Sequence, residues 1–424
     1  MSRKLGIIAV AIAAIAFAIA SEAPAQAPGG SSQVDAYYAR YNAPLWFPSG
    51  IPTPGANALP SILRRAQLDG LAEGPALAQQ VEQAIAEVRT NPSTTMQMDR
   101  VVSAAWVRYV RLLERRMPGF EYADDWAAPR RESVLDILSR AAQPGQLQLI
   151  LKMASVNPVY DNLRNALWNE IHMSGRAPTS TELANLARIR FLAPRGKYVI
   201  VDSSAARLYM MDEHGIADSM RIIVGKPETP TPLVVSVIYY ATANPYWNVP
   251  DNLIRSLVAA RVLARGKSYL KDHNYRVVTE LSPDADEVSN DEVDWTAVAA
   301  GNSTIFVRQL PGPYNSMGKL KFGFANAEDV YLHDTPDKTL FDAQSRLLSN
   351  GCIRLEDAQR LARWLLGSDP APQSDAPEQH LVLPQPVPIV LTYLTLKLDG
   401  ETPTITADAY GWDPTGDASA PVAQ

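Results

Sequence analysis

The sequence contains a single cysteine, Cys352, in the segment SNGCIR, and a histidine, His333, lies upstream of it in YLHDTP. A thiolate is the reactive form of cysteine, and a neighbouring imidazole or a helix N-terminus lowers the pKa of the thiol. The small residue Gly351 allows the backbone N–H groups of residues 350–352 to point together at a developing oxyanion. A thiol nucleophile, an imidazole base and backbone donors together predict a Cys–His acyltransferase or hydrolase.

A lone cysteine can also be a buried and inert side chain without a catalytic role. The start of the chain bears on this choice. Arg3 and Lys4 precede an uncharged apolar run from Leu5 to Ala20, and alanines in an A-x-A pattern follow. The run is shorter than the roughly 20 residues that span a bilayer, so residues 1–25 are predicted to be a secretory signal peptide rather than a membrane anchor. An unpaired thiol is exposed to oxidation after export, and together with the surrounding residues it favours a reactive cysteine.

Two domains are predicted to position these residues. Residues 34–187 have a helical period, with a stripe of apolar residues in the segment 98–112, and form a scaffold without a cluster of catalytic residue types. Further helices are expected at residues 59–71, 75–89, 131–141 and 158–171, and in TSTELANLARIRF. Residues 188–398 are rich in strands such as KYVIVD, ARLYMMD and EDVYLHD, and a disordered tail is expected over residues 410–424. The expected fold is α+β, with a helical scaffold followed by a mostly β, sandwich-like domain.

Within the second domain, His333 ends a predicted strand, and Cys352 comes just before the predicted helix LEDAQRLARWLLG. Glu356 and Asp357 open that helix, where acidic side chains suit the helix dipole. They are interpreted as caps and not as catalytic acids.

The segments YLHDTP and SNGCIR resemble the active-site segment of YkuD-type L,D-transpeptidases, which cross-link bacterial peptidoglycan. VIVDSSAARLYMMD, MRIIVGKPETPTP, NPYWNVP and RQLPGPYNSMGKLKF are further similar to the YcbB-like branch of that family. The resemblance covers about residues 188–369, with weaker similarity at YNAPLW and QLDGLAE. One departure is large: YcbB-like proteins usually carry an inserted peptidoglycan-binding module, and this chain has no room for one between PVYDNL and ANLARIRF.

The resemblance implies that Cys352 is the nucleophile and His333 its base. It implies that Asp334 orients the imidazole through its backbone carbonyl, and that Ser349 and Gly351 belong to the cysteine string. Asn350 departs from the histidine or serine of the family pattern, which leaves side-chain donation at this position open, and its backbone N–H remains as a donor. Arg354 is expected to hold the cysteine loop or a substrate carboxylate. Trp247 and Tyr331 are candidate substrate contacts, although Trp247 is equally well explained by core packing.

The resemblance also implies a reaction. A cysteine thioester forms on a stem peptide, an amino group of a second stem resolves it, and carbapenems acylate the same thiol. If water attacks instead, the enzyme is an L,D-carboxypeptidase; a non-catalytic wall-binding module is a further alternative. The expected partners are donor and acceptor stem peptides, and the expected state is a periplasmic monomer without a cofactor and, once processed, without a membrane span.

Several other classes are disfavoured. Papain-like peptidases carry the cysteine before the histidine, whereas His333 precedes Cys352 here. The five histidines are scattered and no Cys-x-x-Cys is present, so a metal site is not expected. A formal net charge of −6 gives nucleic-acid binding no electrostatic support. The arginines at 108, 111 and 115 are interpreted as a solvated helix face.

Overall fold

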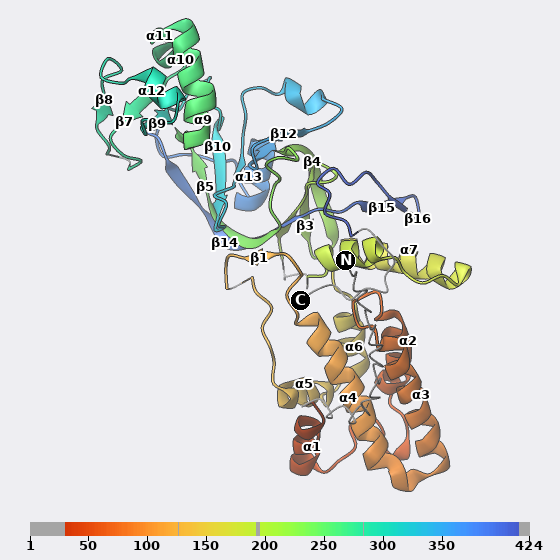
Figure 1. The fold of residues 1–424 in the computed structure, drawn as a ribbon. Coiled ribbons are helices and arrows are strands. Elements are labelled where there is room, and N and C mark those ends of the chain that lie inside the picture. The colour runs from red at the N-terminus through yellow and green to blue at the C-terminus, as the bar shows by residue number, and fades with distance from the viewer. Residues whose placement is uncertain (1–29, 126, 192–195, 283, 415–424) are drawn as a thin grey trace, which may run out of the picture.

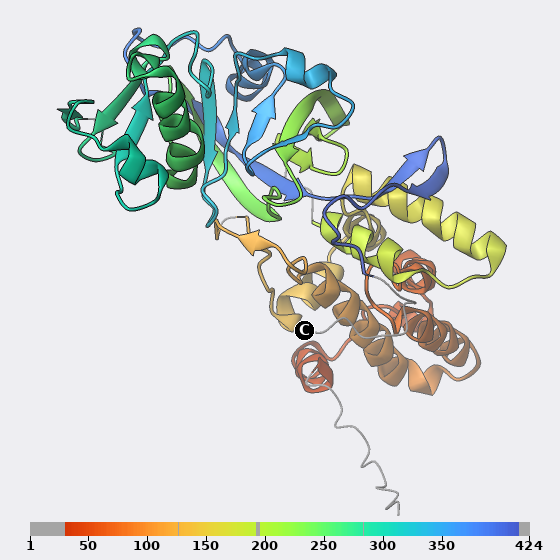
Figure 2. The same cartoon turned by 45° about the horizontal axis from the view of Figure 1, so that its top comes forward.

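The computed structural model describes residues 30–125, 127–191, 196–282 and 284–414. Figures 1 and 2 show an elongated molecule with helices at one end, a curved sheet in the middle and a small sheet with short helices at the other end. The predicted signal peptide, residues 1–25, lies outside the described residues. Among the described residues, no helix combines the length and the apolarity needed to cross a membrane.

The helical domain contains α1 (Gly30–Tyr41), α2 (Pro54–Arg65), α3 (Gly74–Thr90), α4 (Thr95–Leu113), α5 (Val134–Ala141), α6 (Gln146–Ala154), α7 (Pro158–Ser174) and α8 (Ser180–Ile189). The apolar stripe predicted for α4 is buried, with Trp106 and Tyr109 fully enclosed. Asp99 on the same helix is also buried, and it accepts the backbone N–H groups of residues 45, 46 and 47. These bonds fix the loop between α1 and α2 against α4.

The main sheet has ten strands: β1 (Glu121–Tyr122), β2 (Tyr198–Asp202), β3 (Arg207–Asp212), β4 (Gly215–Gly225), β5 (Val234–Ala243), β10 (Leu320–Phe324), β11 (Leu332–His333), β12 (Leu347–Ser349), β13 (Ile353–Leu355) and β14 (Gln379–Thr392). Their order is β1-β5-β10-β11-β13-β4-β3-β2-β14, with β12 on β4. Because β14 also pairs with β5, the strands from β5 to β14 close around an apolar core, onto which α13 (Ala358–Leu366) packs. The predicted α+β class is confirmed.

A small module, residues 247–309, has a core of its own. Its four strands are β6 (Trp247–Asn248), β7 (Tyr275–Val278), β8 (Glu287–Val288) and β9 (Phe306–Gln309), in the order β6-β9-β7-β8. Its helices are α9 (Asp251–Leu253), the π-helix η3 (Ile254–Ala259), α10 (Ala260–Arg265), α11 (Ser268–Asp272) and α12 (Trp295–Ala299). The sequence predicts several of these elements but not their separate core.

The end of the chain differs from the sequence-based expectation. After the hairpin β15 (Leu396–Asp399) and β16 (Thr402–Ile405), the expected disordered tail begins as an ordered segment. The Tyr410 ring stacks on Tyr393 with centroids 4.7 Å apart, and Asp413 pairs with Arg188 at 2.6 Å. Aromatic stacking and a largely buried ion pair order residues 410–413, whereas residues 415–424 lie outside the described part.

Candidate functional site

Two neighbouring strands carry the predicted catalytic pair. β11 and β13 are parallel, and their register pairs Leu332 with Ile353 and His333 with Arg354. Leu332 and Ile353 are fully buried in the apolar core, so His333 and Arg354 occupy the other face. Cys352 comes directly before β13, and its partly buried side chain packs against the edge of the apolar core.

The strand geometry sets the spacing between the thiol and the imidazole. Neighbouring strands lie about 4.8 Å apart and each residue rises about 3.3 Å, so the Cα atoms of His333 and Cys352 are expected about 8 Å apart. Side chains bridge this diagonal distance. Within the described residues, no hydrogen bond joins the side chains of His333 and Cys352.

The imidazole of His333 is buried and has a defined tautomer. Its Nδ1 lies 2.6 Å from the backbone oxygen of Asp334, and a carbonyl oxygen only accepts hydrogen bonds. Nδ1 therefore carries the proton and Nε2 has a free lone pair. The predicted contact through the backbone of Asp334 is present.

The carboxylate of Asp334 is used for a different purpose. It accepts the backbone N–H of Lys319 at 3.0 Å and the ammonium of Lys338 at 2.7 Å. Lys338 also donates to the backbone oxygens of Leu355 and Glu356, at 3.2 and 2.9 Å. The side chain of Lys338 thus ties the segment after His333 to the end of β13, the strand that follows Cys352.

The cysteine loop is held by hydroxyl groups. Ser349 donates to the backbone oxygen of Cys352 at 2.6 Å and accepts the N–H of Gly351 at 3.2 Å. Thr231 donates to the backbone oxygen of Gly351 at 2.7 Å. Gly351 has φ +113, a conformation that L side chains rarely adopt, so a glycine is required at this turn. Ser349 therefore braces the loop from inside.

Two details of the expected nucleophile activation are wrong. The residues after Cys352 form the strand β13, and α13 begins only at Ala358 with Asp357 as its N-cap, so Cys352 does not lie at a helix N-terminus. The N–H of Gly351 is bound to Ser349 and is not available to an oxyanion. Among the described residues, the N–H groups of Asn350 and Cys352 have no acceptor, and these two remain candidate oxyanion donors.

Burial keeps both reacting groups neutral. Burial raises the pKa of the Cys352 thiol above its ordinary value, although hydrogen bonding from Tyr331 and the charge of Arg354 act in the opposite direction. Burial and the charge of Arg354 lower the pKa of His333 to about 3. The expected lowering of the thiol pKa is therefore not found, because desolvation outweighs the favourable neighbours. At neutral pH the pair consists of a thiol and a neutral imidazole.

Arg354 and Tyr331 flank the thiol. Within the described part of the chain, the guanidinium of Arg354 makes no hydrogen bond or ion pair, and Cys352 and Asp337 are its electrostatic neighbours. Ser349 and Thr231, and not Arg354, hold the cysteine loop. The N–H donors of the Arg354 guanidinium are therefore available to an anionic or carbonyl group. Tyr331 lies with its ring centroid 5.9 Å from that of His333, and it packs against the small module.

The candidate substrate contact Trp247 lies in the small module, as does a second histidine, His273. Trp247 is only 7% exposed and packs in the core of the module beside Tyr275, which favours its structural interpretation over a substrate contact. The ring of His273 packs against that of Tyr269, and its Nδ1 lies 3.0 Å from the backbone oxygen of Tyr269. Neither residue joins the group around Cys352.

Sequence reasoning missed the positioning roles of four residues. Lys338, Thr231 and Tyr410 contact the site segments from separate parts of the chain; the Tyr410 hydroxyl donates to the backbone oxygen of Gly225 at 2.6 Å, and Thr231 accepts the N–H of Gly225. Gly318 is the fourth, because any Cβ there would overlap Asp334. The segment MRIIVGKPETPTP contains Gly225 and Thr231. Its strand-turn pattern is the only local sequence feature that could have indicated any of these four positioning roles.

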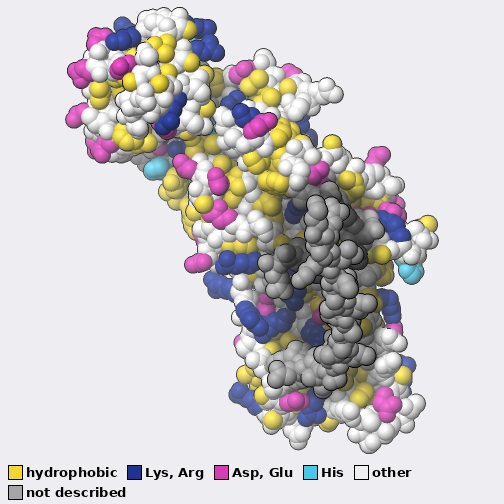
Figure 3. All heavy atoms as spheres, in the orientation of Figure 1, with side chains coloured by type: hydrophobic (Ala, Val, Ile, Leu, Met, Phe, Trp, Pro, Cys, Tyr) yellow, Lys and Arg dark blue, Asp and Glu magenta, His cyan; other side chains and the backbone are white. Residues whose placement is uncertain are grey.

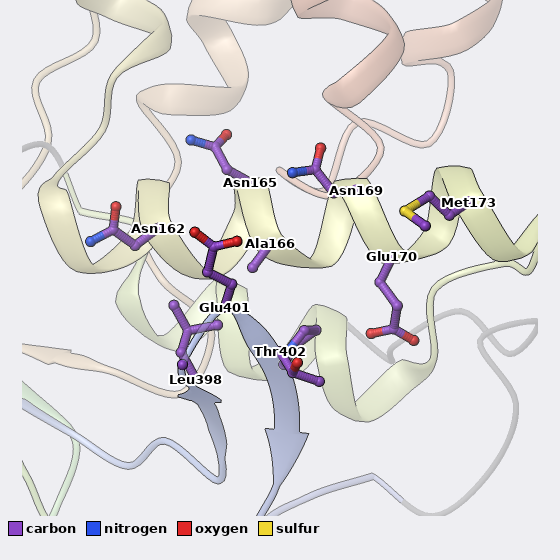
Figure 4. A pocket seen from close by; sticks show the side chains of 11 residues that line it. Asn162, Asn165, Ala166, Asn169, Glu170, Met173, Leu398, Glu401 and Thr402 are labelled. Carbon is purple, nitrogen blue, oxygen red and sulfur yellow. The ribbon is translucent and has the colours of Figure 1, made fainter.

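A groove of about 600 Å³ lies elsewhere, between α7 and the β15–β16 hairpin. Figure 4 shows asparagines 162, 165 and 169 along one side of α7, with Glu401 and Thr402 on the hairpin. None of the residues around Cys352 lines this groove. Within the described residues, no group of three His, Cys, Asp or Glu side chains is arranged to hold a metal ion.

Comparison with known proteins assigns the two domains. A family model described as the L,D-transpeptidase catalytic domain, YkuD, matches residues 196–389, the part of the chain that contains both His333 and Cys352. This part of the chain is a YkuD domain. A model described as a Scaffold domain matches residues 32–167 and covers most of the helices that precede the YkuD domain.

A Haemophilus influenzae protein named "Putative L,D-transpeptidase" is 26% identical over 293 residues, which cover 67% of this chain and 59% of that protein. The chain thus spans less than two thirds of the relative's length. Among solved structures, an L,D-transpeptidase from Mycobacterium smegmatis is 13% identical, with 48% of this chain and 61% of that chain covered and a TM-score of 0.23. Mycobacterium tuberculosis L,D-transpeptidase 1 is also 13% identical, covering 48% and 62%, with a TM-score of 0.22. At such scores these structures add nothing to the family match of the YkuD domain.

Proposed function

We propose that this protein is a peptidoglycan L,D-transpeptidase that joins stem peptides through a thioester on Cys352. The observation that carries the proposal is the pairing of β11, which contains His333, with β13, which directly follows Cys352, within a YkuD domain. The bare Nε2 of His333, fixed by the Asp334 carbonyl, supplies a base for the thiol proton.

Acylation starts from the neutral pair. As the sulfur of Cys352 attacks the carbonyl carbon of the donor stem, Nε2 of His333 takes the thiol proton. The backbone N–H groups of Asn350 and Cys352 stabilise the oxyanion, and the charge of Arg354 favours the developing negative charge. The imidazolium then gives its proton to the departing amine, the peptide bond breaks, and a thioester remains.

Transfer runs through the same groups in reverse. An amino group of the acceptor stem attacks the thioester carbonyl, and His333 takes a proton from it. The carbon–sulfur bond breaks, and the proton returns to the thiolate of Cys352. Attack by water in place of the amine yields the hydrolysed stem, so the balance of these two nucleophiles separates transpeptidase from carboxypeptidase activity.

The proposal includes the cellular setting. The apolar start of the chain supports export to the periplasm, and the segments NPYWNVP and RQLPGPYNSMGKLKF support a place in the YcbB-like branch without the usual inserted module. The enzyme is proposed to act as a monomer on stem peptides, with substrate held by the YkuD domain, the small module and Arg354.

Mass spectrometry of muropeptides tests the proposal. Purified sacculi incubated with the protein are expected to gain cross-linked dimers whose bond joins an L-centre carbonyl to the amine of a second stem. The Cys352→Ala variant is the matched control and should yield none. Shortened stems without dimers would identify a carboxypeptidase, and unchanged sacculi with folded protein would favour a non-catalytic wall-binding module.

A further inference from the structure

A second group of arginines surrounds a cavity in the helical domain. The cavity has a volume of about 450 Å³, and its charged lining residues are Asp69, Arg115, Arg116 and Arg190. Three separate segments line the cavity: the turn after α2, the end of α4 and the end of α8. The cavity lies outside residues 196–389 and contains none of the residues proposed to act with Cys352.

Arg190 is the decisive residue of this cavity. Its side chain is buried, with only 7% of the residue exposed, yet within the described residues its guanidinium makes no ion pair. Nη1 donates to the backbone oxygen of Leu112 at 2.6 Å, which caps the end of α4, whereas the buried Nε has no partner. A buried charge without a counter-ion is costly, so this guanidinium is incomplete as it stands.

The nearest carboxylate does not supply the missing counter-ion. Asp69 lines the cavity, but it accepts the hydroxyl of Tyr160 at 2.5 Å and pairs with the buried guanidinium of Arg164 at 3.0 Å. Burial lowers the pKa of the Arg190 guanidinium, and repulsion from the nearby Arg115 acts in the same direction. The cavity therefore has an excess of positive charge.

The surrounding surface continues this charge. Arg115 and Arg116 are exposed, and among the described residues neither forms an ion pair; Arg116 lies over the ring of Tyr122 at 5.0 Å. Figure 3 shows Lys and Arg side chains gathered at the level where the helices meet the main sheet. Such a concentration is unusual for a chain with a formal net charge of −6.

We propose that this cavity binds a ligand through a phosphate or diphosphate group. Guanidinium groups present paired N–H donors that match phosphate oxygens, and donors from Arg115, Arg116 and Arg190 approach the cavity from two different segments. The volume exceeds that of a single small anion, so a substituted phosphate fits. The anion completes the coordination of the Arg190 Nε and neutralises the three like charges.

Isothermal titration of the purified protein with inorganic pyrophosphate tests the proposal at low salt. Binding of one pyrophosphate per chain is expected, and Arg115→Ala/Arg116→Ala should weaken it at least tenfold. Both arginines are exposed, so this variant should fold, and its thermal unfolding without ligand should match that of the wild type. The control Arg89→Ala/Arg108→Ala removes two exposed positive charges outside the cavity and should change the affinity less than twofold.

Three results would overturn the proposal: no binding of pyrophosphate by the folded protein, equal binding by the Arg115/Arg116 variant, or an equal loss in the control variant. Tighter binding of malonate than of pyrophosphate at matched ionic strength would also overturn it, in favour of a carboxylate site. Co-sedimentation with phosphatidate vesicles separates the two sources of phosphate: vesicle binding through the same arginines identifies a lipid headgroup, and pyrophosphate binding alone identifies a soluble ligand. The measurement uses no peptidoglycan, so it is independent of the proposed transpeptidase activity.

Discussion

Gly318 offers a way to move the base of the proposed reaction without touching it. The residue has φ +61, and a Cβ placed on it would lie 2.5 Å from Cγ and 2.6 Å from Cβ of Asp334. Since even Cβ of Asp334 is overlapped, a rotation of its carboxylate does not relieve the contact. Gly318→Ala must therefore shift the backbone of Asp334, whose carbonyl oxygen accepts the Nδ1 proton of His333.

The expected effect has two parts that a control can separate. Alanine at a left-handed φ costs about 1 kcal/mol of folding stability, and this cost applies equally at Gly318 and at Gly367. At Gly367, where φ is +77, no atom lies within 4 Å of the added Cβ, so Gly367→Ala pays the backbone cost alone. At Gly318, a displacement of the imidazole support is expected to slow acylation about 10- to 100-fold, on the scale of lost orientation in catalysis.

Initial rates of cross-link formation from a purified stem-peptide donor and acceptor supply the assay, at a temperature where both variants are folded. The expected order is wild type, then Gly367→Ala close to it, and Gly318→Ala at least tenfold slower. If Gly318→Ala stays within twofold of Gly367→Ala, the contact between Asp334 and His333 does not position the base, and the reasoning is refuted.

Four further predictions concern the same site. Replacing His333 with alanine should slow acylation about 10²-fold or more, the scale of losing a general base, and an unchanged rate would place the base elsewhere. Because burial raises the pKa of Cys352, the rate of alkylation by iodoacetamide should be low at pH 7 and should still increase above pH 9. Arg354→Met should shift this pH–rate profile to higher pH, because the charge of Arg354 lowers the thiol pKa. A plateau of the rate below pH 7 would contradict the neutral thiol. His333 has a folded pKa of about 3 and an unfolded pKa near 6.5, so its contribution to stability is complete above pH 6.5 and is lost as the pH falls toward 3. Urea unfolding at pH 4.5 should show about 2.5 kcal/mol less stability than at pH 7 from this residue, and His333→Gln should remove that difference. A carbapenem should add one drug mass to the peptide that contains Cys352, and a folded protein whose thiol never acylates would count against the proposed acyl-enzyme.

Local sequence patterns were sufficient for most elements. The stripe on α4 predicted its buried face because a 3.6-residue period follows from helix geometry alone. A helix is expected in TSTELANLARIRF, and Thr179 caps α8 with Glu182 in a capping box. The helix expected at residues 59–71 instead begins at Pro54, since Thr53 caps it and Pro60 lies within its length. Proline inside a helix is locally unfavourable, and only packing offsets it.

Long-range contacts explain what the sequence did not predict. A short helix pattern after Cys352 obscured β13, whose Ile353 and Leu355 are buried through pairing with β11 and β4. The composition after residue 410 is typical of disorder, but the Tyr410 ring stacks on Tyr393 and Trp412 contacts the same ring edge-to-face. No local pattern in the sequence indicates these contacts. The direction of the Cys352 pKa was missed for a similar reason, because burial depends on the whole fold.

Intact-mass measurement of a trapped acyl-enzyme tests the central claim most directly. The protein is mixed with a donor stem peptide, the reaction is stopped with acid to preserve a thioester, and the peptide containing Cys352 is mapped. The proposal predicts a mass gain equal to the donor without its leaving amine, located on Cys352 and absent from Cys352→Ala. Cross-linking that persists in Cys352→Ala, or an adduct on any other residue, would contradict it.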